Sequence, residues 1–349
     1  MRLSLALTAG LTLPERGPIA LLHPRAGENF PSLPAARLAV VTPHATDHAV
    51  FAAQGLALHQ QPEALGSAAA VVICLPRGRA EARDLIARAA ALTDGPVIVD
   101  GQKVDGIDAM LRSLRERVAL EGPIAKGHGK IGWFASPGSA ALADWRAFEK
   151  EISDAGERRF VTLPGLFSAD APDPGSVLLA EALPTALAGE GADLGAGWGY
   201  LSARLLENAP GITALHLVEA DARALACARR NVTDARAWFH WADATQPLPG
   251  QKLDFVITNP PFHTGRAGRP ELGVAFIAAA AAMLRPGGRL WLVANRHLPY
   301  ETALGTRFRK AGEFAAGTAG FKLMLGEGPL RKPQRGTAPR RASGSRRKP

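Results

Sequence analysis

Short apolar runs alternate with amphipathic stretches along the first part of the chain. Val and Ile cluster in residues 38–41, 70–75 and 96–99, which predicts three strands. Between the last two runs, Leu and Ala recur at helical spacing opposite Arg, Glu and Asp, so residues 80–92 are expected to form a helix. This alternation predicts a parallel sheet. Since no glycine-rich ligand loop occurs here, we expect an α/β domain without its own active site.

The pattern changes near the middle of the chain. Glycine-rich residues 126–132 and 135–138 predict loops. Residues 141–152 are expected to form a helix, with Trp145 and Phe148 on one face.

The second half alternates more regularly. Strands are expected at residues 192–194, 214–218, 238–241, 253–258 and 289–294, and helices at 200–208, 221–231 and 273–284, with a closing hairpin over 313–325. This is the pattern of a doubly wound α/β sheet, which binds ligands at the carboxyl ends of its strands. We therefore predict an N-terminal domain over residues 1–155, a catalytic domain over 156–330 and a basic tail over 331–349.

The net charge of +9 over 349 residues belongs mainly to the tail. Residues 331–349 hold eight Lys or Arg and no acid, so the rest of the chain is near neutrality. We expect this Pro-, Gly- and Ser-rich tail to be disordered. It either adds sequence-independent attraction to RNA phosphates or is a solvated tail without a specific role.

The cysteine content and the apolar runs indicate the cell compartment and whether a metal site is expected. The two cysteines, Cys74 and Cys227, have no ligand-like neighbours, which argues against a disulfide framework or a zinc site and fits a reducing cytoplasm. The N-terminus lacks the pattern of a signal peptide. The longest apolar run, residues 274–284, is shorter than the roughly 20 residues that cross a bilayer. We expect a cytoplasmic protein without a membrane span or a metal ion.

A glycine loop follows the first strand of the second half. Residues 193–199 read DLGAGWG, and they join that strand to a helix. Gly195, Gly197 and Gly199 let the backbone turn sharply and approach a ligand, and the helix after them offers free N–H groups. A dinucleotide loop would have a third glycine where Tyr200 stands, so the spacing favours S-adenosylmethionine. A simple tight turn is the alternative.

Three acids are candidate cofactor ligands. Asp193 would hold the ammonium group of the cofactor, directly or through water. Glu219 ends the second strand, 24 residues after Gly195, where a carboxylate can accept hydrogen bonds from ribose hydroxyls. The alternative for Glu219 is an ordinary acid before a helix. Asp243 follows the third strand and would bind the adenine amino group, unless it is only a loop aspartate.

The fourth strand ends in the segment TNPPF at residues 258–262. The side-chain oxygen of Asn259 and the carbonyl of Pro260 can accept hydrogen bonds from one exocyclic amine, and Asn259 also lies beside the cofactor. The amine would be positioned in line with the methyl group, and the same oxygens would stabilise its developing positive charge. Phe262 can stack on a base, and His263 is a further substrate contact. A plain Asn-Pro turn is the alternative.

Residues 162–325 closely resemble the bacterial small-subunit ribosomal RNA guanine-N2 methyltransferases. Four segments carry the resemblance: TLPGLFS at 162–168 with Asp173 and Gly175-Ser176, the glycine loop, NPPFH at 259–263, and VAN at 293–295 with LPY at 298–300. It implies two Rossmann-like α/β domains, of which the N-terminal one has lost its cofactor site and the C-terminal one has a seven-stranded, mostly parallel sheet. It also implies that Phe167 contacts the substrate.

The resemblance implies methylation of a guanine N2 amine, with ribosomal RNA or the small subunit as the partner of a monomeric enzyme. Trp198 and Tyr200 depart from the small residues usual in the glycine loop of the family. The alternatives are guanine-N2 methylation of large-subunit RNA, N-methylation of a protein glutamine or a DNA adenine, and a catalytically inactive RNA-binding module. The last would predict loss of the glycines, Glu219 or Asn259, and all are present.

Overall fold

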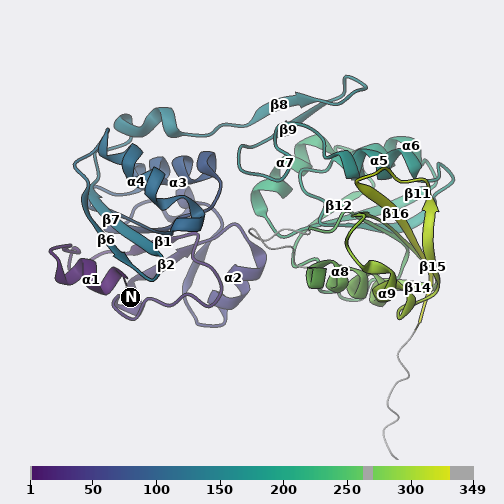
Figure 1. The fold of residues 1–349 in the computed structure, drawn as a ribbon, viewed down its shortest axis with the longest axis horizontal. Helices are drawn as coiled ribbons and strands as arrows, with labels where there is room; N and C mark the ends of the chain where they lie inside the picture. The colour runs from purple at the N-terminus through teal and green to yellow at the C-terminus, as the bar shows by residue number, and fades with distance from the viewer. Residues whose placement is uncertain (1, 262–269, 331–349) are drawn as a thin grey trace, which may run out of the picture.

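The computed structural model describes residues 2–261 and 270–330, and the N-terminal half forms a seven-stranded sheet of order β3-β2-β1-β4-β5-β7-β6 (Figure 1). The strands in this spatial order are Ala57–His59 (β3), Leu38–Val41 (β2), Ile19–Leu22 (β1), Ala70–Cys74 (β4), Pro96–Gln102 (β5), Gly129–Ala135 (β7) and Glu121–Lys126 (β6). Strands β1 to β5 are parallel, and β7 is antiparallel to both neighbours. Strands β1 and β2 are buried along their whole length, as expected for a sheet that is covered on both faces.

Helices cover both faces of this sheet. They are Arg2–Thr8 (α1), Ala45–Ala52 (α2), Arg79–Leu92 (α3) and Ile107–Arg115 (α4), with the short 3₁₀ helices Ala35–Arg37 (η1), Pro62–Leu65 (η2), Lys103–Asp105 (η3) and Ala140–Trp145 (η4). Buried side chains of α3 and α4 share one apolar cluster with one face of the strands, and those of α1 and α2 pack on the other face (Figure 1).

The C-terminal half repeats the strand order position by position, as β12-β11-β10-β13-β14-β16-β15. These strands are Ala237–Trp241 (β12), Ile212–Glu219 (β11), Gly189–Leu194 (β10), Leu253–Thr258 (β13), Leu284–Asn295 (β14), Phe321–Pro329 (β16) and Phe308–Ala315 (β15). Strand β16 is antiparallel to β14 and β15, and the other pairs are parallel. The predicted pair of α/β domains with a seven-stranded, mostly parallel sheet is confirmed.

Helices of the C-terminal half also lie on both faces of their sheet. They are Pro174–Ala182 (α5), Tyr200–Asn208 (α6), Ala222–Asn231 (α7), Pro270–Met283 (α8) and Tyr300–Gly305 (α9). Helices α5, α6 and α7 pack on one face, and α8 and α9 on the other (Figure 1). No helix in residues 2–261 or 270–330 combines the length and apolarity needed to cross a membrane.

A two-stranded hairpin of Lys150–Ser153 (β8) and Arg159–Thr162 (β9) follows η4 in the chain and lies next to α7 of the C-terminal half (Figure 1). The proposed domain boundary at residue 155 falls in the turn of this hairpin, and it stays a prediction. Strand β9 packs on α7, where the Asn231 side chain accepts a hydrogen bond from Val161 N at 2.7 Å. The hairpin is therefore bound to helix α7 of the C-terminal half.

Two expectations for the middle of the chain are wrong. Residues 126–132 lie mostly in β6 and β7 and do not form a loop. The two strands are joined by a tight turn at Gly127 and His128, whose φ angles are +59° and +58°. The helix expected at 141–152 is replaced by η4, which ends at Trp145, and by β8. Trp145 is 4% exposed and Phe148 is 71% exposed, so the two rings do not share a buried face.

Candidate active site

The candidate site lies between β10 and β13, where the strand order of the C-terminal sheet reverses. Leu194 at the end of β10 pairs with Thr258 at the end of β13, and Thr258 Oγ1 donates a hydrogen bond to the Leu194 carbonyl at 2.7 Å. The glycine loop and the Asn259 loop therefore leave the sheet side by side. Such a reversal opens a crevice at the carboxyl ends of the strands, which is where doubly wound sheets bind ligands.

The glycine loop requires its glycines for two different reasons. Gly195, Gly197 and Gly199 have φ of +73°, +56° and +90°, in the left-handed region that side chains disfavour. A Cβ on Gly199 would lie 3.0 Å from Val232 Cγ2, so this glycine also allows α6 to pack against α7. A Cβ on Gly197 would meet nothing within 4 Å. The middle of the loop is therefore open to a ligand.

Glu219, at the end of β11, holds the glycine loop. One carboxylate oxygen accepts from Gly197 N and the other from Asp221 N, both at 2.8 Å. Burial raises the pKa of Glu219, although these backbone donors favour its ionised form. Each carboxylate oxygen can accept more than one hydrogen bond, so the side chain retains acceptor capacity for ligand hydroxyls.

Asp193 lies beneath the loop. It is 1% exposed, and its carboxylate accepts a hydrogen bond from Ser202 Oγ at 2.7 Å. Burial raises its pKa to about 7, and the nearby charge of Glu219 adds to this shift. Two neighbouring carboxyl groups with raised pKa values form a site that would gain from a cationic ligand. A contact between Asp193 and the cofactor stays a prediction.

Asp243 forms a turn just after β12. Its Oδ1 atom accepts from Thr245 N at 2.8 Å and from Thr245 Oγ1 at 2.7 Å, which is the geometry of an Asx turn. The side chain is half-buried, and its adenine contact stays a prediction.

The amide of Asn259 is held by the start of α5. Its Nδ2 atom donates to Asp173 Oδ2 at 2.7 Å and to Ser176 Oγ at 2.9 Å. Asp173 is also the N-cap of α5 and accepts from Ser176 N at 2.9 Å. Both amide hydrogens of Asn259 are thus used, and its Oδ1 atom is left as an acceptor. The sequence singled out Asp173 and Ser176 as part of a family motif, and an Asp before Pro174 is a typical helix start, but their contact with Asn259 was not predicted.

The predicted substrate contacts are only partly described by the structure. Phe167 is 63% exposed, and its carbonyl accepts from Trp198 Nε1 at 3.1 Å, which ties this residue to the glycine loop. Pro260 is buried beside Asn259. Phe262 and His263 lie outside the described residues.

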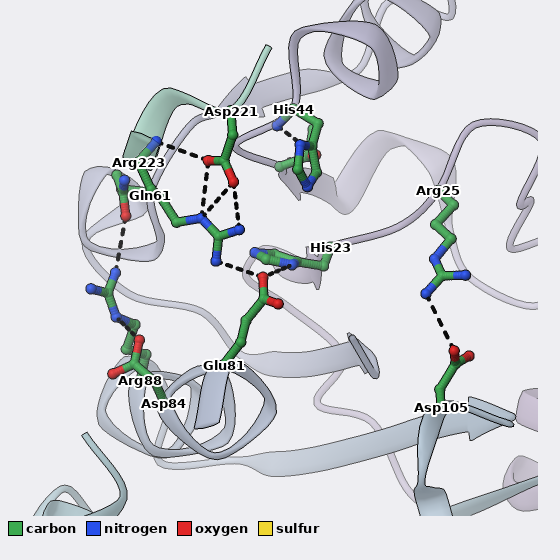
Figure 2. Close-up of polar contacts among 11 residues, drawn as sticks. His23, Arg25, His44, Gln61, Glu81, Asp84, Arg88, Asp105, Asp221 and Arg223 are labelled. Carbon is green, nitrogen blue, oxygen red and sulfur yellow. Dashed lines mark hydrogen bonds and ion pairs between the residues drawn. The ribbon is translucent and has the colours of Figure 1, made fainter. Parts of the chain in front are cut away.

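An ion-pair cluster around Arg223 joins helices α3 and α7 of the two halves (Figure 2). Arg223 of α7 contacts Glu81 of α3 at 2.5 Å and Asp221 at 2.7 Å. Burial alone would raise the pKa of Asp221, but the hydrogen bonds and charge of Arg223 hold it below its usual value. His23 faces the same cluster, and burial together with the charge of Arg223 lowers its pKa to about 3, so it is neutral.

Backbone contacts bring the carboxyl ends of β2 and β11 together. Ala45 N donates to the Ala220 carbonyl at 2.8 Å, and Ala222 N donates to the Pro43 carbonyl at 2.9 Å. Trp241 Nε1 lies 2.9 Å from the carbonyl oxygens of both Pro43 and Ala220. The N-terminal half therefore supports the segment that follows Glu219, a contact that no pattern in the sequence indicates.

Comparison with known proteins places this geometry in a family. The methyltransferase small domain family matches residues 157–325. A ribosomal RNA small subunit methyltransferase C from Shewanella loihica is 30% identical over 264 residues, which cover 73% of this chain and 75% of that protein. The protein of the same name from Shewanella halifaxensis is 31% identical over 246 residues, covering 68% and 71% of the two chains.

A solved structure agrees over both halves. It is the T. Thermophilus 16S rRNA N2 G1207 methyltransferase in complex with AdoMet and guanosine, at a TM-score of 0.78 and 26% identity, covering 91% of this chain and 90% of that one. The resemblance carried by the four sequence segments is thus confirmed across the whole fold. The chain belongs to the ribosomal RNA small subunit methyltransferase C family.

Proposed function

We propose that this protein transfers a methyl group from S-adenosylmethionine to the exocyclic N2 amine of a guanine in small-subunit ribosomal RNA. The observation that carries the proposal is the fixed amide of Asn259 at the switch point, beside a glycine loop that is open at Gly197. The names of the relatives and the AdoMet and guanosine bound by the T. Thermophilus structure support the same chemistry.

The residues around the glycine loop fit S-adenosylmethionine. Glu219 would accept hydrogen bonds from the ribose hydroxyls, and Asp243 would contact the adenine. Asp193 would act on the ammonium group, and Gly195, Gly197 and Gly199 would admit the ligand close to the backbone. The raised pKa values of Asp193 and Glu219 suit a ligand that carries positive charge. When bound, this cosubstrate supplies an electrophilic methyl group.

Asn259 would hold the target nitrogen. Its Oδ1 atom and the Pro260 carbonyl would accept the two hydrogens of the guanine amine, which directs the nitrogen lone pair toward the methyl group. Asp173 and Ser176 keep the amide from rotating, because they occupy both Nδ2 hydrogens. The two oxygens also stabilise the positive charge that develops on nitrogen, since they need no reorientation during the reaction.

The target base must leave any helix in which its amine is paired. RNA-modifying enzymes commonly take such a base from a loop or extrude it, and they stack it on an aromatic ring. Phe167, exposed and tied to the glycine loop, would contact the extruded nucleotide, together with Phe262 and His263. We propose that the protein works as a cytoplasmic monomer on ribosomal RNA or the small subunit.

The test is methyl transfer from labelled S-adenosylmethionine to isolated subunits and naked ribosomal RNA from cells that lack this gene. We expect label in small-subunit RNA, at the guanine that corresponds to G1207, the 16S nucleotide named for the T. Thermophilus enzyme. Label confined to large-subunit RNA would keep the mechanism and reject the target. Label on a glutamine peptide or on DNA adenine, with none on RNA, would reject the proposal.

A further inference from the structure

A surface groove runs along the side of α3, close to the loop that carries Phe167. It has a volume of about 560 Å³. The residues that matter for its chemistry are Arg79, Arg83, Trp145, Arg146, Phe148 and Pro164. They come from the start of α3, from η4 and the segment after it, and from the loop between β9 and α5.

Two arginines, Arg79 and Arg83, supply positive charge to the groove. Arg79 is exposed, and the guanidinium of Arg83 lies 5.1 Å from the centre of the Trp145 ring. Neither makes an ion pair with any residue that the structure describes. Arg83 Nε is also buried without a hydrogen-bond partner within the described part of the chain. Because this nitrogen is buried, a ligand in the groove would be attracted by the charge of the Arg83 guanidinium and would not contact Nε.

The remaining charges of the groove are already matched. Arg146 contacts Asp84 at 3.2 Å and Glu63 at 3.7 Å. Asp144, an acid on the groove wall, accepts two hydrogen bonds from Arg117 at 2.6 and 2.8 Å. These hydrogen bonds lower the pKa of Asp144, and the charge of Arg83 adds to this shift. Arg83 is thus partly matched, and the attraction for anions comes mainly from the exposed Arg79.

An exposed aromatic ring stands beside these arginines. Phe148 is 71% exposed, although burial would stabilise a Phe side chain by roughly 1.5–3 kcal/mol. Proteins that bind single-stranded nucleic acid combine a positive groove, which follows the phosphates, with aromatic rings on which bases stack. The pairing of Phe148 with these two arginines matches this chemistry.

One wall of the groove belongs to the loop that carries Phe167. Pro164 on its wall is three residues before Phe167, whose carbonyl is bonded to Trp198 of the glycine loop. The intervening Gly165 lies against α3, since a Cβ there would be 2.8 Å from Glu81 Cβ. An RNA strand in the groove would thus lie beside the loop that carries Phe167.

We infer that this groove binds the single-stranded RNA that flanks the target guanine. Arg79 and Arg83 contact backbone phosphates, and Phe148 stacks on a base. The inference rests on the proposed function, and it gives the N-terminal half a part in substrate binding. It also explains why an aromatic side chain after η4 is left exposed to solvent.

The test compares Arg79→Ala and Phe148→Ala, both at exposed positions, in the full chain. The controls are Arg309→Ala and Val104→Ala, which remove an exposed charge and an exposed apolar side chain elsewhere. Affinity for transcribed 16S ribosomal RNA is measured across a range of salt concentrations. We expect each groove variant to bind RNA about tenfold more weakly than wild type. Affinity for S-adenosylmethionine and the thermal unfolding temperature should stay at wild-type values.

The salt dependence separates the two roles. Log affinity falls as log salt rises, and Arg79→Ala should make this slope less steep by about 0.7, because one phosphate contact to a single strand is lost. Phe148→Ala should leave the slope unchanged. Wild-type RNA affinity in both variants would overturn the inference. Weakened binding to assembled subunits with unchanged binding to naked RNA would also overturn it, because a ribosomal protein would then occupy the groove. A wild-type protein that methylates no RNA would instead reject the proposed function.

Discussion

The Nδ2 atom of Asn259 lies 2.7 Å from Oδ2 of Asp173, although the two residues are 86 positions apart in the chain. This contact connects the N-terminus of α5 to the catalytic loop. It gives Asp173 and Ser176, which precede the glycine loop in the sequence, a role in the site. They orient the amide that would receive the guanine amine.

Asp173→Ala should lower kcat about 100-fold without changing the affinity for S-adenosylmethionine, because the Asn259 amide loses the acceptor that sets its orientation. Asp173→Asn should lower kcat by only about tenfold, since Asn can still accept both hydrogen bonds but without charge assistance. Asn is also as good an N-cap as Asp, so a purely structural role of Asp173 would leave Asp173→Asn at the wild-type rate. Steady-state methylation with saturating RNA measures the difference.

Glu219→Ala should weaken binding of S-adenosylmethionine by about 10- to 100-fold, which corresponds to the loss of hydrogen bonds to a charged group. The affinity of Glu219→Gln should lie between those of Glu219→Ala and wild type, because one acceptor oxygen remains. Titration calorimetry of the free enzyme reports the affinity directly. Equal affinities of all three proteins would show that Glu219 only supports the glycine loop.

Binding of S-adenosylmethionine should depend on pH through Asp193. Its pKa of about 7 in the free protein lies above its ordinary value of 3.8, so folding favours the protonated form. The stability contributed by this shift is full below about pH 4 and is lost as the pH rises toward 7. A cationic ligand favours the ionised form, so affinity should fall about tenfold for each pH unit below 7.

Asp193→Asn should remove most of this pH dependence, because the neutral amide does not titrate. Calorimetric titrations between about pH 5.5 and pH 8 compare the two proteins. The same slope in both would contradict the assignment of the ionisation to Asp193.

Glu81→Ala should lower the Tm by a few degrees, since Arg223 loses one of its two acids in a largely buried ion pair. Affinity for S-adenosylmethionine should fall as well, because Arg223 and Asp221 fix the chain directly after Glu219. Glu313→Ala, in an exposed ion pair with Arg296, is the matched control and should change neither quantity. An unchanged Tm and affinity in Glu81→Ala would show that the cluster does not support the cofactor site.

Local patterns were sufficient for most of the catalytic half. Buried strands such as Leu253–Thr258 are recognisable as apolar runs. The turn of the glycine loop is predictable because glycine tolerates positive φ. The same local reasoning failed at residues 126–135, where a turn at Gly127 and His128 joins two strands that pack through Ile131 and Trp133. The glycines there belong to a hairpin, although a glycine-rich pattern by itself predicts a loop.

Contacts between distant segments could not be predicted from the sequence. The pairing of Asn259 with Asp173, and of Arg223 with Glu81, depends on how the sheet and helices assemble. From the sequence alone, a charged residue on a helix is predicted to face solvent, because its partner in a distant segment is not known. The groove along α3 is a further example, because it combines η4 with a loop of the other half.

The most direct test of the central claim is nucleoside mass spectrometry of small-subunit RNA after reaction with wild-type protein and with Asn259→Ala. We predict N2-methylguanosine with wild type, and at least a 100-fold slower appearance with Asn259→Ala at unchanged affinity for S-adenosylmethionine. A methyl group on any other atom of the RNA, or a variant that forms N2-methylguanosine at the wild-type rate, would contradict the account.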